Sequence, residues 1–121
     1  MKINIKTTSL DLTPAITDYV NKKIKDLEKF IDPNDESAVA NVDIGRTTEH
    51  HKSGDVYKTE VNIHIAGKDF RMEYVEEDLY ASIDGAKDAL SRDLSAYKGK
   101  KQTMERKGGS IIKRILKGFG K

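Results

Sequence analysis

Apolar and polar residues alternate in four segments of the chain, and apolar residues recur at helical spacing in two others. Residues 2–8, 38–47, 56–66 and 70–74 alternate, which is typical of strands with one buried face. Residues 14–30 and 79–98 carry apolar side chains three and four positions apart, which predicts two amphipathic helices. The predicted fold is α+β with the order β-α-β-β-β-α, a two-layer sandwich with a four-stranded sheet and two helices on one face.

Local signals mark the start of both helices. Thr13 can cap the first helix, and Asp78 is a good N-cap for the second. The second helix is expected to run to about Lys98. Two of its tyrosines, Tyr80 and Tyr97, lie near or within the apolar stripe, so packing in the core or at its boundary is the expectation for both.

Charge is distributed unevenly along the chain. Residues 1–98 carry a net charge of −5 and residues 99–121 one of +7, which together give the formal +2 at pH 7. Cationic tails of this kind usually meet nucleic acid, an anionic membrane or an acidic protein surface. The alternative is a solubilising end without a partner.

Several classes of protein are excluded by what the sequence lacks. It has no cysteine, so it can form neither a disulfide framework nor a thiolate zinc site, which is compatible with a reducing cytoplasm. No apolar run is long enough for a signal peptide or a membrane-spanning helix. With 121 residues, of which 35% are charged, the chain is expected to form one soluble domain.

No strong catalytic motif is present. A phosphate-binding glycine loop, a nucleophile elbow and a zinc-protease motif are all missing. Glu49-His50-His51 with Asp55 can in principle hold a metal, but a solvated hairpin loop is the favoured interpretation. The acids of Glu76-Glu77-Asp78 stand at a helix start, where capping explains them without acid–base catalysis. We therefore predict a protein that is not an enzyme and needs no cofactor, metal or small-molecule substrate.

The first helix carries a basic stripe. At about 100° per residue, Lys22, Lys25 and Lys29 fall together opposite the apolar face. Three cations so placed can dock an RNA backbone. Asp18 and Asp26 lie close by, so a merely solvated outer face is the alternative.

The second helix is less basic on its exposed side. Lys87, Lys98 and Lys101 lie along one flank of its apolar stripe, and Arg92 lies further round on the outer face. Acidic residues are interspersed with these cations, which weakens this helix as a surface for RNA.

Residues 102–121 are predicted to form a basic tail with a linker at residues 107–109 and a short amphipathic helix that Ser110 can cap. Its apolar and basic residues fall on opposite arcs: Ile111, Ile112, Ile115, Leu116 and Phe119 on one, and Lys113, Arg114 and Lys117 on the other. So short a helix is marginal alone in water and is expected to order on a partner. The candidate partners are a membrane surface, an apolar protein groove and the ribosome; folding back onto its own domain is the alternative.

Two motifs carry a family resemblance. One is the run Glu77-Asp78-Leu79-Tyr80-Ala81-Ser82-Ile83-Asp84, followed by Leu94 and Tyr97-Lys98; the other is Leu10-Asp11-Leu12-Thr13-Pro14-Ala15. With the β-α-β-β-β-α order, the chain over residues 1–101 resembles the bacterial ribosome hibernation-promoting factors, also called ribosome-associated inhibitors or sigma-factor modulation proteins. It resembles the short type, which lacks a second, dimer-forming domain.

The resemblance implies a cytoplasmic, ribosome-associated protein. Family members bind the small ribosomal subunit in its decoding region, occlude the mRNA and tRNA sites and inhibit translation under stress or in stationary phase. The contacts that it implies with ribosomal RNA are Lys22, Lys25, Lys29, Lys87, Arg92, Lys98, Lys100 and Lys101. Three acids of the second helix, Asp84, Asp88 and Asp93, depart from a purely basic surface. The alternative is a generic RNA-binding or protein-adaptor module that shares the fold.

Overall fold

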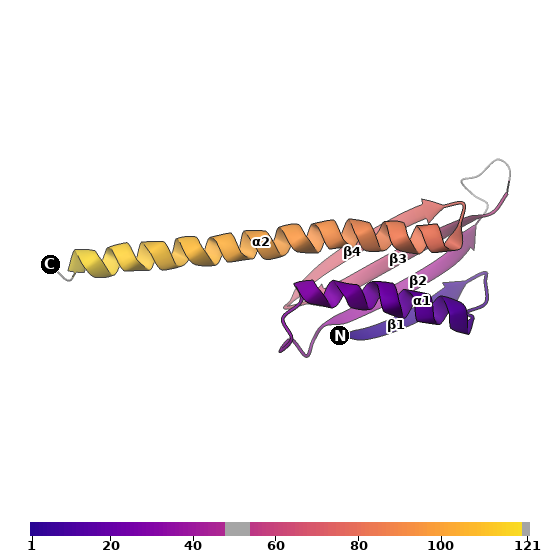
Figure 1. Ribbon diagram of the computed structural model, residues 1–121, viewed down its shortest axis with the longest axis horizontal. Helices are drawn as coiled ribbons and strands as arrows, with labels where there is room; N and C mark the ends of the chain where they lie inside the picture. The colour runs from indigo at the N-terminus through magenta and orange to yellow at the C-terminus, as the bar shows by residue number, and fades with distance from the viewer. Residues whose placement is uncertain (48–53, 120–121) are drawn as a thin grey trace.

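The structure is a computed structural model that describes the backbone of residues 1–47 and 54–119, with side chains up to Lys100 (Figure 1). The predicted order β-α-β-β-β-α is confirmed, with one short 3₁₀ helix, η1, added after the first helix. The elements are β1 (Lys2–Thr8), α1 (Pro14–Lys25), η1 (Asp26–Phe30), β2 (Val39–Thr47), β3 (Val56–Ile65), β4 (Lys68–Glu76) and α2 (Leu79–Phe119).

The four strands form one mixed sheet in the order β1-β2-β3-β4. β1 and β2 are parallel, because α1 and η1 return the chain across the sheet between them. The β2–β3 and β3–β4 pairs are antiparallel, and the second of these is closed by a tight turn at Ala66 and Gly67. Both turn residues have positive φ, 48° and 77°, a conformation that glycine adopts without strain.

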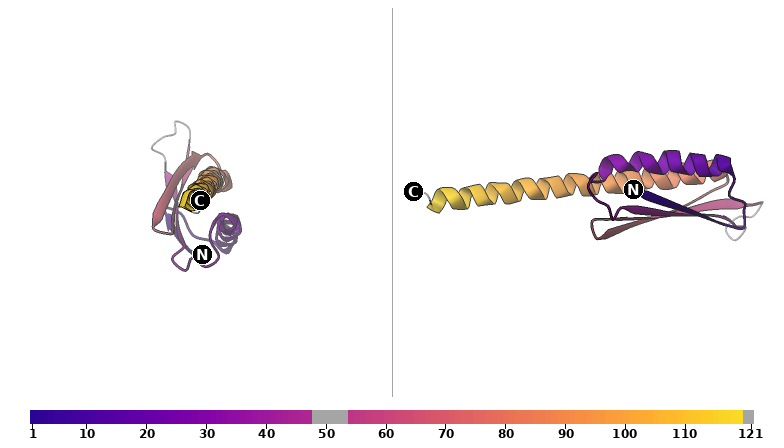
Figure 2. Two further views of the ribbon diagram at one scale, coloured as in Figure 1. Left: turned by 90° about the vertical axis from the view of Figure 1, so that its left-hand side faces the viewer. Right: turned by 90° about the horizontal axis from the view of Figure 1, so that it is seen from below.

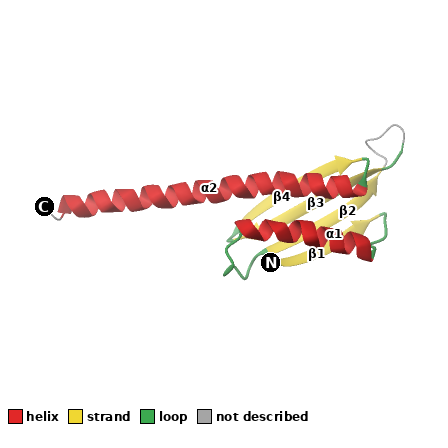
Figure 3. Cartoon of the chain, in the orientation of Figure 1, coloured by secondary structure: helices red, strands yellow, loops and turns green. Residues whose placement is uncertain are grey.

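The two helices lie side by side on one face of the sheet and leave the other face open (Figures 2 and 3). This is the two-layer arrangement that the sequence predicts. α1 and α2 begin at the same end of the sheet and run in the same direction (Figure 1). Their outward surfaces therefore form one continuous layer.

The core lies between the two layers and follows from the sequence pattern. On the sheet side it is built from rows of residues in register across the strands, such as Ile5, Val42, Val61 and Met72. On the helix side the fully buried residues are Val20, Ile24, Leu27, Ile83, Ala86, Leu90 and Leu94. Burying each large aliphatic side chain stabilises the fold by about 1.5–3 kcal/mol before the entropic cost of ordering it.

The first helix differs from the prediction in its last turns. An α-helix to about Phe30 is expected, but the chain tightens at Asp26 into the five-residue 3₁₀ helix η1. Leu27 remains fully buried, and Phe30 and Ile31 pack against the core. The tighter winding follows from this local packing, and it shifts Lys29 away from the straight stripe that a uniform 100° per residue predicts.

The second helix does not end near Lys98, and the prediction of a separate short helix after a linker was wrong. α2 is one helix of 41 residues, about 60 Å long, and its second half extends beyond the sheet (Figure 1). Residues 100–107 are mostly strong helix formers, and no proline stands between Leu79 and Phe119. Gly108 and Gly109 weaken the helix without ending it. Among the described helices none is apolar enough over a sufficient length to cross a membrane.

α2 is seated on the sheet by a close approach and a buried polar pair. A Cβ at Gly85 would come within 2.2 Å of the Tyr74 ring, so only glycine allows β4 and α2 to approach this closely. Tyr74 points toward the helix layer as predicted, but it lies on an edge strand and stays 37% exposed. Inside the core the hydroxyls of Thr59 and Ser82 lie 2.7 Å apart, and Ser82 Oγ also donates to the Leu79 carbonyl at 2.6 Å.

Candidate nucleic-acid interface

The outer face of α1 presents exposed lysines. Thr13 Oγ1 accepts a hydrogen bond from the Ile16 N–H at 3.2 Å, which fixes where the helix begins. Ile16 and the buried residues one and two helical turns after it face the core, so Lys22 and Lys25 face outward. Both are exposed, and neither forms an ion pair with a side chain that the structure describes. These two cations are available to a polyanion.

Lys29, the third member of the predicted stripe, is partly engaged. It lies on η1, where its Nζ is 3.5 Å from Asp26 Oδ2 and 5.2 Å from the centre of the Phe30 ring. Its carbonyl accepts a hydrogen bond from Lys98 Nζ at 3.1 Å. Lys29 and Lys98 therefore mark the point where η1 meets the second helix.

On α2 the predicted cations fall into different environments. Arg92 and Lys100 are exposed and form no ion pair with the described side chains. Lys87 is only 16% exposed, and its Nζ is 3.0 Å from Asp26 Oδ2 and 3.9 Å from Asp88 Oδ1. The side chains of four predicted contacts lie outside the described residues: Lys101, Lys113, Arg114 and Lys117.

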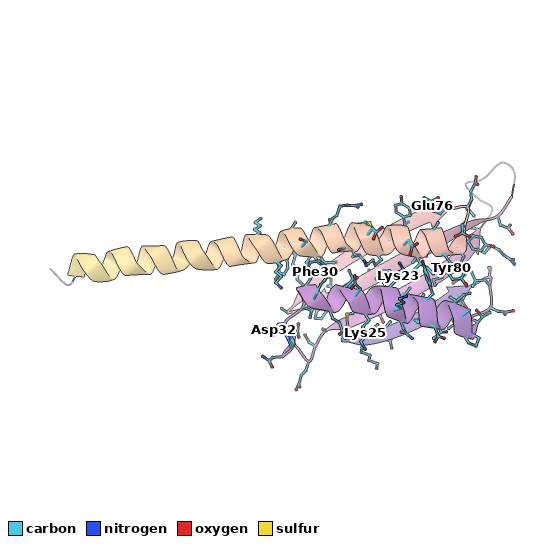
Figure 4. The ribbon with its side chains drawn as sticks, viewed as in Figure 1. Lys23, Lys25, Phe30, Asp32, Glu76 and Tyr80 are labelled. Atoms are coloured by element: carbon cyan, nitrogen blue, oxygen red, sulfur yellow. The ribbon has the colours of Figure 1, made fainter. Side chains whose placement is uncertain are left out.

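A polar network joins the two helices, and the sequence reasoning missed it. Tyr19 donates a hydrogen bond to Asp84 Oδ1 at 2.6 Å, and Lys23 Nζ is 3.5 Å from the same oxygen. Lys23 also lies 5.4 Å from the centre of the Tyr19 ring. Figure 4 shows Lys23 in the space between the helices, with Lys25 on the side of α1 away from α2. The signal that could have revealed the network was the position of Tyr19 and Lys23, four residues apart on the flank of the apolar stripe.

Contacts at the seam between the helices shift the pKa values of two side chains. The hydrogen bond to Asp84, together with desolvation and the charge of that carboxylate, raises the pKa of the Tyr19 hydroxyl to about 12. The hydrogen bond from Lys87 and the positive charge of Lys29 lower the pKa of Asp26. Tyr19 is thus a hydrogen-bond donor and Asp26 an anion throughout the physiological range.

The acids of α2 weaken its basic surface less than the sequence suggests. Asp84 is engaged by Tyr19 and Lys23, so much of its charge is neutralised within the protein. Asp88 lies near Lys87, and Asp93 is exposed. The outward surface of α2 therefore carries cations with two acids nearby, Asp88 and Asp93.

Two side chains of types that can serve catalysis or metal binding, Asp78 and His64, form structural contacts. Asp78 Oδ2 accepts the Ala81 N–H at 2.9 Å, which confirms it as the cap of α2. His64 Nδ1 is 2.8 Å from Asp69 Oδ1 across the β3–β4 hairpin. Among the described residues no three acidic or histidine side chains are grouped as metal ligands. Glu49, His50 and His51 lie outside the described residues.

The open face of the sheet has a different electrostatic character. One row across the four strands reads Lys6, Asp43, Glu60 and Glu73. Its acids are partnered by cations on neighbouring strands: Lys6–Asp43 at 3.6 Å, Arg71–Glu60 at 3.2 Å and Lys58–Glu73 at 3.9 Å. Because these cations are engaged by carboxylates, the face offers little attraction to phosphate.

A hollow in the described surface lies on this same face. It has a volume of about 430 Å³ and is lined by polar and charged residues of β1, β2 and β3, among them Asp43, Arg46 and Glu60. It contains charges of both signs and no aromatic wall. This composition does not favour a small apolar ligand or a stacked base.

Comparison with known proteins identifies the family. Residues 3–102 match the family described as sigma 54 modulation protein / S30EA ribosomal protein. The chain belongs to this family. The chain is similar to the ribosome hibernation promoting factor of Azotobacter vinelandii, with 35% identity over 109 residues, covering 90% of this chain and 92% of that protein. The ribosome hibernation promotion factor of Bacillus subtilis is 32% identical over 120 residues, covering 99% of this chain but 60% of that longer protein.

Two solved structures have the same fold as this chain. The N-terminal domain of Thermus thermophilus Protein Y superposes with a TM-score of 0.67 at 28% identity, covering 80% of this chain and 99% of that domain. A ribosomal subunit interface protein from Coxiella burnetii superposes with a TM-score of 0.65 at 19% identity, which shows the fold alone. The resemblance identified in the sequence is therefore confirmed at the level of family and fold.

Proposed function

We propose that this protein is a ribosome hibernation factor that binds the small ribosomal subunit in its decoding region. There it occludes the sites of mRNA and tRNA and inhibits translation under stress or in stationary phase. Family membership and the names of the relatives support this role. The protein is a non-enzymatic, ribosome-binding protein, acts in the cytoplasm where ribosomes are, and works by occupancy alone.

The observation that carries this proposal is the distribution of cations between the two faces of the sheet. Lys22, Lys25 and Arg92 are exposed on the helix layer without an ion pair to the described side chains. Exposed cations bind RNA by displacing counterions from its phosphates, whereas cations already engaged by carboxylates gain less. The outer surface of α1 and α2 is therefore the proposed RNA-binding surface.

The proposed contacts have unequal weight. Lys22, Lys25, Arg92 and Lys100 form no ion pair with the described side chains, so they can bind phosphate without first leaving such a partner. Lys29, Lys87 and Lys98 must first leave the partners that hold them, so each contributes less than its charge suggests. Lys101 is included as a proposed contact on its position in the helix.

The tail, residues 102–121, is proposed as a second contact through Lys113, Arg114 and Lys117. Its backbone continues α2 away from the sheet, so it can reach a surface that the body of the protein does not touch (Figure 1). The candidate surfaces are the ribosome, a protein groove and a membrane. Deleting residues 108–121 should leave residues 1–101 folded and weaken binding to ribosomes or to anionic vesicles; unchanged binding to both would contradict a contact role.

The proposal is tested by sedimenting the purified protein with small ribosomal subunits at low and high salt. Binding is expected at 50 mM salt and should fall steeply by 200 mM, because each phosphate contact releases counterions. Large subunits serve as the control for nonspecific attraction to RNA. Equal binding to both subunits, with the same salt dependence, would favour a generic RNA-binding module.

Occlusion of the decoding region needs its own test. Small subunits preloaded with mRNA and initiator tRNA should bind the protein more weakly than vacant subunits, and the protein should slow the loading of vacant ones. If all three ligands bind together without competition, the decoding region is not the site. Recovery of one protein without ribosomal RNA from a cell extract would favour the adaptor alternative.

A further inference from the structure

An exposed tyrosine stands at the start of α2 beside the basic surface. Tyr80 is the second residue of the helix and is 37% exposed, although the sequence predicts core or boundary packing for it. Its partner in that prediction, Tyr97, does pack against the core, with its ring centre 5.2 Å from that of Phe70. Exposure therefore distinguishes Tyr80 from Tyr97, the other tyrosine of α2.

The ring of Tyr80 is held in place before any ligand binds. It meets the ring of Tyr19 edge to face, with centres 4.7 Å apart and planes at 80°. Tyr19 is itself fixed by its hydrogen bond to Asp84 and by Lys23 beside its ring. Figure 4 shows Tyr80 and Lys23 in the space between the two helices. A ring that is already ordered loses little conformational entropy when a ligand stacks on it.

The charges around Tyr80 indicate what can stack there. Asp78 lies two residues before Tyr80 and Glu76 ends the strand that leads into the helix, whereas much of the charge of Asp84 is neutralised by Tyr19 and Lys23. Carboxylates repel a phosphate from this position but not a neutral base. Lys22, by contrast, lies one helical turn from Tyr19 on the outer side of α1, where a phosphate is attracted. A nucleotide with its phosphate near Lys22 can thus place its base toward Tyr80.

We propose that Tyr80 is a stacking platform for an unpaired base of the RNA that binds the helix layer. This inference rests on the proposed function, because it takes the occupant to be ribosomal RNA. Stacking on an aromatic ring is favourable for every base and is a usual means of binding unpaired nucleotides. The lysines and Tyr80 then divide the work: the lysines contact the backbone, and the ring contacts a base.

The test compares substitutions that keep or remove an aromatic ring. Tyr80→Phe and Tyr80→Trp should bind small subunits within about twofold of the unaltered protein, since both retain a π face. Tyr80→Leu keeps an apolar contact with Tyr19 but should weaken binding about five- to thirtyfold, the effect of losing one stacked base. The salt dependence of binding should stay unchanged in Tyr80→Leu, whereas Lys22→Ala should lower its slope by about one unit.

Chemical probing of the ribosomal RNA gives a second readout. Base-specific modification should show an unpaired base that the unaltered protein protects and that Tyr80→Leu leaves reactive, with backbone protection retained. Thermal melting checks that the variants fold, and Tyr80→Met replaces Tyr80→Leu if the leucine variant does not.

The outcomes separate the two proposals. If the unaltered protein binds small subunits and the leucine or methionine variant binds equally well with the same base protection, the stacking role of Tyr80 is overturned while the proposed function stands. If Tyr80→Phe weakens binding as much as Tyr80→Leu, a hydroxyl contact replaces stacking and the inference also fails. If the unaltered protein does not bind small subunits, both proposals fall.

Discussion

The two faces of the sheet carry similar kinds of residues and have different electrostatic properties. On the open face, lysine and arginine side chains project from strands that lie beside acidic strands, and Lys6, Lys58 and Arg71 each pair with a carboxylate on a neighbouring strand. On the helix layer, Lys22, Lys25 and Arg92 project from convex surfaces and form no ion pair with the described side chains. Lys6, Lys58 and Arg71 are thus neutralised on the open face, whereas Lys22, Lys25 and Arg92 are available on the helix layer.

The difference follows from geometry. In a sheet, side chains on adjacent strands are about 4.5–5.5 Å apart, so opposite charges meet in register. On the outer side of a helix the nearest neighbours lie on the same helix, and α1 places Lys22 and Lys25 there. Of the two acids close by, Asp18 and Asp26, the second is paired with Lys87 and Lys29. A surface that binds a polyanion needs cations without internal partners, and the helix layer is where this fold leaves them.

The largest expected effect comes from reversing charge on the helix layer. Changing Lys22, Lys25 and Arg92 together to glutamate should weaken binding to small subunits about 100-fold or more at 0.1 M salt, since phosphate contacts are replaced by repulsion. The matched control compares the single variants Lys22→Glu and Lys2→Glu. Lys2 is an exposed lysine of β1 on the open face and forms no ion pair with the described side chains. If sedimentation shows equal losses for Lys2→Glu and Lys22→Glu, the contrast between the faces does not govern binding.

The next effect concerns how α2 is fixed on the sheet. Thr59→Val removes one hydroxyl of the buried pair with Ser82 and should lower the free energy of unfolding by about 1–3 kcal/mol, measured by urea denaturation. Ser82 keeps its bond to the Leu79 carbonyl, so the loss should fall in the lower half of that range. The double variant with Ser82→Ala should lose less than the sum of the single losses. Strict additivity would show that the two hydroxyls act independently.

A smaller effect separates stability from binding at the seam between the helices. Asp26→Asn releases Lys87 and Lys29 and should tighten binding to small subunits about two- to fivefold at low salt while lowering the melting temperature. The pKa of Asp26 is lower in the folded protein than its ordinary value of 3.8. Its stabilising effect is therefore fully present well above pH 3.8 and is lost as the pH falls through the lowered pKa.

The check for Asp26 is a set of melting temperatures between pH 2 and pH 7 for the unaltered protein and for Asp26→Asn. The difference between them should be largest near pH 7 and shrink toward pH 2. A difference that is constant over this range would show that the Asp26 charge does not stabilise the fold.

The smallest effect is expected on the open face. Lys6→Ala breaks an exposed ion pair with Asp43, and such pairs contribute at most about 1 kcal/mol. Binding to small subunits should change by less than about twofold, and the melting temperature should fall only slightly. A loss of binding comparable to that of Lys22→Ala would place RNA on the sheet and overturn the comparison.

Most of the fold could be predicted because its signals are local. Alternation along the strands, the Thr13 and Asp78 caps and the apolar stripes of the helices gave the order of elements and most of the core. Strand order and the parallel β1–β2 pair have no signal in one segment alone. The end of α2 was misplaced because Gly108 and Gly109 were taken as a linker, whereas the helix formers around them carry the helix to Phe119.

The candidate site was only partly predictable, for a related reason. Sequence spacing places Lys22 and Lys25 on an outer face, and it makes Lys87 look equivalent to them. Whether a cation has a partner depends on residues far away in the chain, as when Lys87 meets Asp26 and Lys23 meets Asp84. Local periodicity determines which way a side chain points. Charge neutralisation, by contrast, depends on distances of a few ångströms in space. Only the packing of α1 beside α2 therefore decided which lysines remain available and whether the Tyr80 ring stays exposed.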